Sequence, residues 1–489
     1  MLFWDKLLAP VRFRKNNTVK PLPNDGRTPY KKDFDTVCNS TILRRLQDKA
    51  QVFPLEKEDY ARTRLTHSIE AMAIAESLGM QARELVFENL DPYICKDQER
   101  DITKKRINDI PKILATAALL HDMGNPPFGH LGEQIIGDWF KDNLPKLTKR
   151  ADGRFAVKDG GDAESTLAYK LKGKYAQDLV HFEGNAQLLR LVTKLNYVVD
   201  HDGMNLTFPV IATFIKYPCS SLTIDKKVLS KKKMGYFSAE EEKYFSISNT
   251  LGLNNCRYPL AFLLEAADDI AYLTADIEDA HKKGIISISC LEDYLNRIPN
   301  DSIIEKVLQE IQKYRSAGKA NGYPNIEDYI IRRIRIYIKG IMINAINDAF
   351  KNKYEAIMNG TCEEELISAS EAANLAEALR SLEREKIYYC KSIVESKTRA
   401  FRIIHGLMDA YIPAVLNYKE QDSGKDTTEH ILYLSLSENY RYICEQANKK
   451  EKDESIQLYN RLLLVTDQIS GMTDSRAMTT YQTISAMKF

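Results

Sequence analysis

Residues 110–133, IPKILATAALLHDMGNPPFGHLGE, determine the fold that we predict for this chain. The proline near their start suits the first turn of a helix, and the apolar run that follows predicts a buried helix that reaches His121 and Asp122. GNPPFG at 124–129 cannot continue a helix, because it contains two prolines and two glycines, and a new helix is expected to begin near His130. A buried helix that ends on an adjacent His-Asp pair is the first candidate for a functional centre.

Helical periodicity extends to both sides of this segment. After His67, apolar residues recur at steps of three and four on a stripe that contains His67 itself: Ala71, Ile74, Leu78, Ala82 and Leu85. This imidazole is therefore predicted to point inward. A second long amphipathic helix is expected over 258–283, with Asp268, Tyr272 and Asp276 on one face. Two histidines and two aspartates are thus expected to meet in the interior from separate helices.

The remaining segments indicate a mainly α fold with few strand signals. Further helices are expected at 303–315, 326–352, 365–418 with a break, 427–450 and 453–469. Turn dipeptides around a short apolar core favour one small hairpin within 149–162. We predict three parts: an irregular N-terminal arm laid over the surface (1–34), a helical core (35–285), and a helical C-terminal region packed on that core (286–489).

Composition excludes several classes of protein. The 489 residues contain 69 Lys and Arg against 68 Asp and Glu, so a globally basic nucleic-acid coat is excluded. Eight cysteines without a CxxC pair are typical of reduced thiols, and the longest apolar run, 113–120, is too short to span a membrane. The first residues lack the pattern of a signal peptide. We expect a soluble cytoplasmic protein.

One local basic stretch lies within a polar segment at about 216–246. It contains five lysines within eight positions, namely Lys226, Lys227, Lys231, Lys232 and Lys233. A solvated loop and a patch that binds a polyanion such as single-stranded DNA are both compatible with this pattern. The sequence leaves this choice open.

The inward-facing set of His67, His121, Asp122 and Asp268 is the strongest chemical signal. A buried carboxylate costs several kcal/mol unless it is paired or binds a metal. Two imidazoles and two carboxylates form a mixed nitrogen and oxygen set, which suits Mn²⁺, Mg²⁺, Co²⁺, Ni²⁺ or Fe²⁺ better than a structural zinc ion. The sequence therefore predicts one divalent metal ion per chain.

These residues lie in motifs that resemble a known superfamily. RLTH at 64–67, HDMGNPPFGHLGE at 121–133 and EAADDIAYLTADIEDA at 265–280 resemble the HD-domain phosphohydrolases, and within them the bacterial deoxyguanosine triphosphate triphosphohydrolases. The resemblance covers about residues 35–480. It includes further motifs in the same order: QVFPL at 51–55, FEGNAQLLR at 182–190, ATFIKYP at 212–218, RIIHGLMDAY at 402–411 and ISGMTD at 469–474.

The resemblance implies an HD-domain helical core and hydrolysis of a deoxynucleoside triphosphate, with dGTP preferred, to the deoxynucleoside and inorganic triphosphate. It also implies that His67, His121, Asp122 and Asp268 bind the metal ion. Mn²⁺ or Mg²⁺ is the favoured ion.

His130 and Glu133 are predicted to form a catalytic pair. They lie three residues apart at the start of a helix and hence on one face. The resemblance makes them the acid/base or water-activating pair, and the alternative is an ion pair that caps the helix. The sequence does not decide which of the two moves the proton.

Candidate substrate contacts come from several segments. Arg64, Lys216 and Tyr217 are candidates for the phosphates. The resemblance places Tyr272 against the deoxyribose and Asp276 at the 3′-hydroxyl, although a core tyrosine and a buried ion-pair partner are the alternatives. Weaker candidates for sugar, base or phosphate contacts are Gln51, Val52, Asn185, Gln187, Arg399, Arg402 and Arg441.

Partners are also implied by the resemblance. It favours a homo-oligomer, with a hexamer first, and single-stranded DNA or a nucleotide as an effector. Two other functions stay open: an HD phosphohydrolase that acts on another nucleotide phosphoester, and a catalytically silent regulator that binds nucleic acid.

Overall fold

The computed structural model describes residues 1–14, 25–55, 60–157, 162–196, 202–419 and 427–486. The prediction of a mainly α fold is confirmed. The helices up to the end of the predicted core are α1 (Trp4–Leu7), α2 (Pro29–Cys38), α3 (Thr41–Arg45), α4 (Arg64–Glu88), α5 (Arg100–Ile107), α6 (Ile110–Leu120), α7 (Gly129–Asn143), α8 (Leu167–Lys170), α9 (Lys174–Val180), α10 (Gly184–Arg190), α11 (Phe208–Phe214), α12 (Glu241–Leu251) and α13 (Pro259–Lys282).

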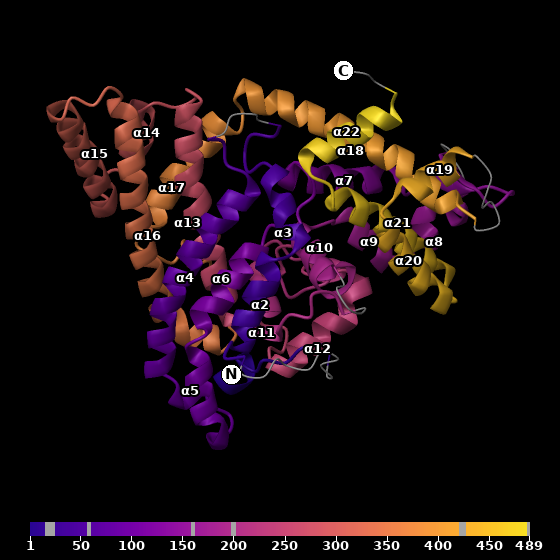
Figure 1. Ribbon diagram of the computed structural model, residues 1–489, viewed down its shortest axis with the longest axis horizontal. Coiled ribbons are helices and arrows are strands. Elements are labelled where there is room, and N and C mark those ends of the chain that lie inside the picture. Colours follow the sequence, from indigo (N-terminus) through magenta and orange to yellow (C-terminus); the bar gives the residue numbers. More distant parts are fainter. Residues whose placement is uncertain (15–24, 56–59, 158–161, 197–201, 420–426, 487–489) are drawn as a thin grey trace.

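The C-terminal region is helical throughout its length. Its helices are α14 (Ile288–Asn296), α15 (Ser302–Ala320), α16 (Ile326–Met358), α17 (Ala373–Leu382), α18 (Lys391–Asn417), α19 (Thr428–Ser435), α20 (Glu438–Lys450), α21 (Glu454–Ser470) and α22 (Asp474–Ile484). In Figure 1, α14 to α17 form one end of the molecule, α18 and α22 lie along the top, and α19 to α21 lie at the other end.

The centre of the fold is built from α4, α6 and α13. Helices α4 and α6 pack closely, and α13 lies against α4, α6 and α16. Gly79 allows the close approach of α4 to α6, because a Cβ there would lie 2.7 Å from the Cα of Pro111. The apolar run of α6 is buried on all sides, as its continuous hydrophobicity predicts. The functional candidates therefore project from a rigid packed interior.

The hairpin is present but lies earlier than predicted. Strands β1 (Leu147–Lys149) and β2 (Phe155–Val157) pair antiparallel, with Leu147 opposite Val157. The predicted segment 149–162 extends past β2, and its residues 158–161 lie outside the described residues. The Asp-Gly dipeptide at 152–153 correctly indicated the turn of the hairpin, and the two strands lie on either side of it.

The prediction of an irregular surface arm at 1–34 is wrong for its first residues. Trp4 and Leu7 in α1 are buried, and the Trp4 indole donates a hydrogen bond of 2.8 Å to the hydroxyl of Tyr354 in α16. Helix α2 also begins inside this segment, and residues 15–24 lie outside the described residues. The buried apolar residues, Leu2, Trp4, Leu7 and Leu8, form too short a run before Pro10 to give a helical period.

Several C-terminal bounds also differ from the prediction. The expected helix at 427–450 consists of two helices, α19 and α20, because the chain is extended at Leu436. Helices α14 and α22 were not predicted. The break within 365–418 is a π-helical turn at Glu383–Ile387 between α17 and α18. The division into three parts stays a prediction.

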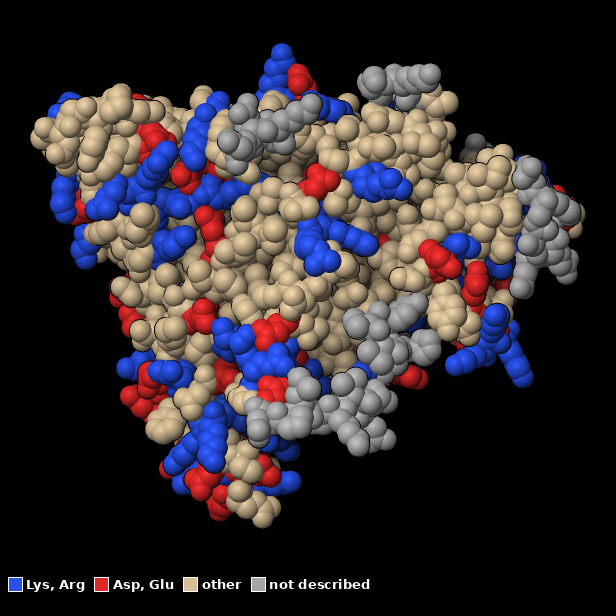
Figure 2. Space-filling model, viewed as in Figure 1, with Lys and Arg blue, Asp and Glu red and all other residues tan. Residues whose placement is uncertain are grey.

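The surface carries mixed charge, as the near-zero net charge predicts. On the face in Figure 2, basic and acidic side chains are interspersed, for example around α5. Among the helices of the described residues, none is both long and apolar enough to cross a membrane.

Candidate active site

Three central helices bring the predicted metal ligands together. His67 lies on α4, His121 and Asp122 directly follow α6, and Asp268 lies on α13. The Nε2 atom of His67 lies 3.0 Å from Oδ1 of Asp268, and Nε2 of His121 lies 3.3 Å from the same oxygen. One ligand atom each from His67, His121 and Asp122 lies within 4.8 Å of the others. The four residues form one compact cluster.

The donor set of this cluster fits a divalent cation. The Nδ1–H of His121 donates to the Ala118 carbonyl at 2.6 Å, which leaves Nε2 as the ring atom that faces the Asp268 oxygen. Two acceptor atoms at this separation repel each other unless a proton or a metal ion lies between them. Nε2 of His121 is buried and has no hydrogen-bond partner among the described residues. A metal ion would satisfy this atom and the Asp268 oxygen that it faces.

The electrostatics of the cluster agree with this conclusion. Burial lowers the pKa of His121, but the Asp122 and Asp268 carboxylates outweigh it and raise that pKa to about 9. Burial raises the pKa of Asp122, whereas Arg64 and the two histidines hold it well below its usual range. Burial likewise raises the pKa of Asp268, whereas Lys216 and the histidines hold it well below its usual range. Both carboxylates are therefore ionised and favour a cation beside them, which is either a proton on His121 or a metal ion that replaces this proton.

Three further residues orient the two aspartates. Arg64 Nη1 lies 2.7 Å from Oδ2 of Asp122, and Lys216 Nζ lies 3.2 Å from Oδ2 of Asp268. The side-chain amide of Asn125 donates to Oδ1 of Asp122 at 2.6 Å. Such partners fix the orientation of metal ligands. Asn125 was missed in the sequence, although it lies three residues after Asp122.

His130 and Glu133 form the expected pair on α7. Nδ1 of His130 lies 2.9 Å from Oε2 of Glu133, and the Gly184 amide donates to Oε1 of Glu133 at 3.0 Å. The His130 side chain is 75% exposed, whereas that of Glu133 is 6% exposed. The imidazole thus stands free to meet a ligand, and the buried carboxylate holds it in place.

His130 and Glu133 shift each other's pKa values in opposite directions. The Glu133 carboxylate raises the pKa of His130. Burial raises the pKa of Glu133, but His130 and Lys233 lower it to about 2. Gly184 is required here, because a Cβ at this position would lie 2.5 Å from Oε1 of Glu133. The motif EGNAQ therefore supports the pair through its glycine.

A cavity of about 520 Å³ opens above the metal cluster. It extends from Asp122, Asp268 and Arg64 past His130 and along α13. Predicted residues that line it are Gln51, Val52, Arg64, Asp122, His130, Asp268, Tyr272 and Asp276. Residues that line it and were not predicted are Pro54, Phe128, Leu131, Arg380, Glu383, Arg384, Tyr388, Ile393, Ser396 and Lys397. The cavity therefore combines the core with the start of the C-terminal region.

One end of the cavity contains two buried carboxyl groups. Burial and the nearby Asp279 raise the pKa of Asp276 to about 8, and burial and Asp276 raise that of Glu383 well above its usual value. Oδ1 of Asp276 and Oε1 of Glu383 are buried and have no hydrogen-bond partner. These atoms are available to a ligand that brings hydroxyl or N–H groups.

Some predicted residues lie outside the lining of this cavity. Lys216 contacts it only through Asp268, and Tyr217 is buried beside Lys216. Asn185 donates to Oε1 of Glu183 at 2.9 Å. Arg399, Arg402 and Arg441 in the C-terminal helices do not line it either.

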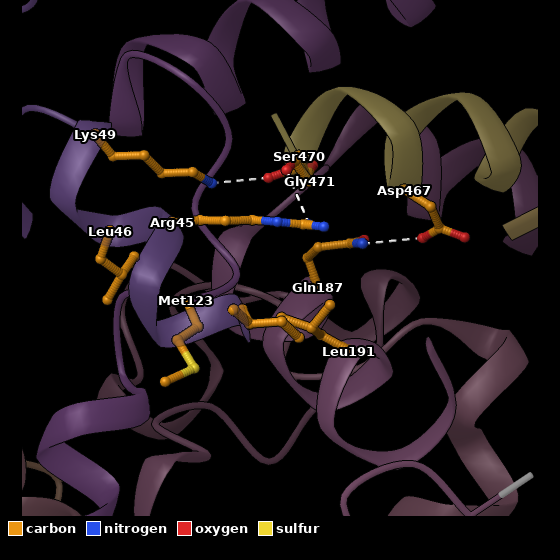
Figure 3. A pocket seen from close by; sticks show the side chains of 10 residues that line it. Arg45, Leu46, Lys49, Met123, Gln187, Leu191, Asp467, Ser470 and Gly471 are labelled. Atoms are coloured by element: carbon orange, nitrogen blue, oxygen red, sulfur yellow. Dashed lines mark hydrogen bonds between the residues drawn. The ribbon is translucent and has the colours of Figure 1, made fainter. Parts of the chain in front are cut away.

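Gln187 instead serves a structural cluster. It donates to Asp467 at 2.9 Å and lines a second cavity of only about 10 Å³, room for about one water molecule. Figure 3 shows this contact, together with Lys49, which donates to the Ser470 carbonyl at 2.8 Å. The cavity is too small for a substrate.

The lysine stretch is tied to the body of the molecule. Met234 and Phe237 are buried, so a fully solvated loop is wrong for this part of the segment. Lys233 Nζ lies 2.8 Å from Oε2 of Glu183, and Lys232 Nζ lies 3.4 Å from Oε1 of Glu365. Two of the five lysines thus have acidic partners. Binding of a polyanion stays a prediction.

Comparisons with known proteins agree with this geometry. The HD domain family model matches residues 64–170, which include His67, His121 and Asp122 but not Asp268. A deoxyguanosinetriphosphate triphosphohydrolase-like protein of Listeria monocytogenes is 41% identical over 99% of both chains. A deoxyguanosinetriphosphate triphosphohydrolase of Yersinia enterocolitica is 30% identical over 94% of both chains. A deoxyguanosinetriphosphate triphosphohydrolase-like protein of Synechocystis is 29% identical over 98% of both chains.

These similarities span nearly the whole chain, including the C-terminal helices that close the cavity. They confirm the resemblance read from the sequence motifs. The chain belongs to the deoxyguanosinetriphosphate triphosphohydrolase family of HD-domain proteins.

Proposed function

We propose that this protein hydrolyses deoxynucleoside triphosphates, with dGTP preferred, to the deoxynucleoside and inorganic triphosphate. The observation that carries this proposal is the continuity of one cavity from the metal cluster to the unpartnered carboxyl groups of Asp276 and Glu383. A substrate with an anionic group at one end and hydroxyl groups at the other would match this cavity: its anionic group would meet the metal cluster, and its hydroxyl groups would meet the carboxyl groups.

The metal site would be formed by His67, His121, Asp122 and Asp268, with Mn²⁺ or Mg²⁺ as the favoured ion and Co²⁺, Ni²⁺ or Fe²⁺ as alternatives. A bound divalent ion supplies charge neutralisation at the α-phosphoryl group and a lower pKa for bound water. Asp122 and Asp268 are held for this task by Arg64 and Lys216.

The protein's own residues would position the triphosphate. Arg64 lines the cavity next to the cluster, and Arg380, Arg384 and Lys397 line it from the C-terminal side. Lys216 and Tyr217 would act beside the cluster. Phosphoryl transfer depends mainly on such positioning and on charge stabilisation. His130, held by Glu133, would transfer the proton.

The opposite end of the cavity would select the nucleoside. Tyr272 would pack against the deoxyribose and leave no room for a 2′-hydroxyl, and Asp276 would accept from the 3′-hydroxyl. Gln51 and Val52 would contact the base. Guanine presents adjacent N–H donors, which suit the unpartnered Glu383 oxygen. Asn185 would act only indirectly, because it contacts Glu183 rather than the cavity.

Product analysis tests the proposal. The four dNTPs and four NTPs are incubated with Mn²⁺ or Mg²⁺, with and without an oligonucleotide, and all products are resolved. Deoxynucleoside with intact triphosphate is expected. Pyrophosphate with a monophosphate, or sequential loss of single phosphates, would contradict it and favour a phosphohydrolase with another nucleotide substrate. Absence of turnover with every nucleotide would favour a regulator.

Discrimination against ribonucleotides gives a second test. Tyr272→Ala is expected to narrow the ratio of dGTP to GTP turnover by roughly 10-fold or more, because it removes a steric exclusion. Unchanged discrimination would show that Tyr272 is a core residue only.

The assembly and the cellular setting are also part of this proposal. A homo-oligomer, with a hexamer favoured, and regulation by single-stranded DNA or a nucleotide follow from the family, and a cytoplasmic location follows from the sequence composition. Light scattering of the purified protein with and without these ligands measures the subunit count.

A further inference from the structure

A third cavity lies apart from both the catalytic cavity and the small cavity at Gln187. Its volume is about 300 Å³, at the lower end of the range for small-molecule sites. It lies between the turn that precedes α13, the end of α16 and the lysine stretch, and its lining includes Arg257, Lys231, Cys256 and Glu363. Among these residues, Arg257 is the least expected.

The Arg257 guanidinium is buried but only partly used. Its side chain is 2% exposed, and Nη2 lies 2.6 Å from Oε2 of Glu265. Its Cζ also lies 4.6 Å from the centre of the Phe262 ring. Nε and Nη1, which carry three of the five N–H donors, are buried and have no partner. Unused charged donors in a buried position cost free energy, so they call for an acceptor in the cavity.

The remaining lining favours an anion as that acceptor. The carboxylate of Glu363 is already satisfied, because it accepts hydrogen bonds from the Ser230 amide at 2.9 Å and from the Ser230 hydroxyl at 2.7 Å. Lys231 and the side-chain amides of Asn254 and Asn255 supply further donors. The lining thus carries two cationic side chains against one carboxylate, and that carboxylate already accepts two hydrogen bonds.

The start of α13 adds to this positive potential. Arg257 lies two residues before this 24-residue helix, and the N-cap residue Tyr258 makes no side-chain capping bond. The N-terminus of a helix carries a partial positive charge that favours anions. The helix dipole and the guanidinium therefore act in the same direction.

We propose that this cavity binds a phosphate-bearing small molecule through Nε and Nη1 of Arg257. Phosphate oxygens accept strong hydrogen bonds from the N–H groups of a charged guanidinium, and the opposite charges add to the attraction. The site is distinct from the catalytic cavity, with which it shares no lining residue. The proposal is independent of the proposed hydrolase activity.

Cys256 provides a local measurement of occupancy. This partly buried free thiol lines the cavity, whereas Cys38 and Cys95 are exposed elsewhere and serve as internal controls. The metal-loaded protein is alkylated with iodoacetamide at constant ionic strength, in chloride or in inorganic phosphate, and each cysteine is followed by mass spectrometry. Phosphate at ten times its Kd should slow the alkylation of Cys256 roughly tenfold, because the rate follows the unoccupied fraction.

Variants separate a specific site from a general salt effect. Arg257→Lys keeps a charge beside Glu265 but removes Nε and Nη1, and it should abolish the protection of Cys256. Arg257→Gln should do the same, and thermal melting checks that both variants fold. Lys226→Gln is the matched control, because Lys226 lies in the same stretch but does not line the cavity. It should retain full protection.

The source of the phosphate is resolved by parallel arms with inorganic phosphate, inorganic triphosphate and glycerol phosphate. Protection of Cys256 by any of them that is lost in Arg257→Lys supports the site and identifies its preferred ligand. Equal alkylation rates in every arm would show that water alone fills the cavity and would overturn the proposal. Protection that persists in both Arg257 variants would overturn it too.

Discussion

Two clusters of charged residues in this molecule differ in how their charges are paired. Arg190 on α10 donates from Nε and Nη2 to Asp467 on α21, each at 2.7 Å, and from Nη1 to Glu240 at 2.7 Å. In the metal cluster, by contrast, Nε2 of His67 and Nε2 of His121 both face Oδ1 of Asp268, and Nε2 of His121 has no hydrogen-bond partner among the described residues. The Arg190 cluster is buried throughout, whereas the side chain of Asp268 is 19% exposed and lines the large cavity.

The difference separates a structural role from a functional one. The guanidinium of Arg190 has a carboxylate for each of its nitrogens, so this cluster joins α10 to α21 and offers little to a ligand. The metal cluster keeps acceptors directed at one point, at a cost that only a cation offsets. Substitutions in the two clusters should therefore affect different properties, namely activity in one and stability in the other.

The largest effect is expected at Asp268. Asp268→Ala should remove the bound metal and all measurable turnover, because this carboxylate contacts both histidines. Elemental analysis and a dGTP assay measure the two losses. Asp276→Asn, two helical turns along α13, is the control and should keep its metal. Wild-type metal content in Asp268→Ala would show that Asp268 is not a metal ligand.

Arg190→Met should destabilise the fold by about 3–5 kcal/mol, because it leaves two buried carboxylates without their partner. Chemical denaturation followed by circular dichroism measures the loss. Lys194→Met is the matched control: its Nζ lies 3.9 Å from Oε1 of Glu240 and is partly exposed, so its loss should cost about 1 kcal/mol or less. Metal content should be unchanged in both. If Arg190→Met were as stable as Lys194→Met, the Arg190 cluster would not have the structural role inferred for it.

His130→Ala tests the part of the proposed catalytic site that is not a predicted metal ligand. It should keep the metal and lower kcat by roughly 10²–10⁴, the usual contribution of a positioned acid or base. The thermal melt should stay close to that of the wild type, because the imidazole is 75% exposed. Near-normal turnover would reduce the pair with Glu133 to a structural role.

Sequence periodicity was sufficient for the parts of the site that lie on long helices. His67 and Asp268 belong to amphipathic stripes, and the prolines after Asp122 fix where α6 ends. Each of these residues is oriented by its own helix. The local sequence pattern was therefore enough to predict where these side chains point.

Residues positioned by tertiary packing were not predictable in the same way. Glu383 lies in a π-helical turn and meets Asp276 only because the C-terminal region closes over α13. Lys233 reaches Glu183 through an irregular path that has no period. Trp4 is buried by α16, more than three hundred residues away in the chain. Such contacts depend on the completed fold, which no local window of sequence contains.

The smallest effect is a shift in pH dependence, and it addresses which residue moves the proton. Glu133 raises the pKa of His130, so Glu133→Gln should lower that pKa and move the inflection due to His130 to lower pH. If neutral His130 is the base, the acidic limb of the kcat/KM profile moves to lower pH. If protonated His130 is the acid, the alkaline limb moves in that direction instead. Glu183→Gln should move it less, because Glu183 pairs with Lys233. An inflection that stays in place in Glu133→Gln would exclude His130 as the titrating group.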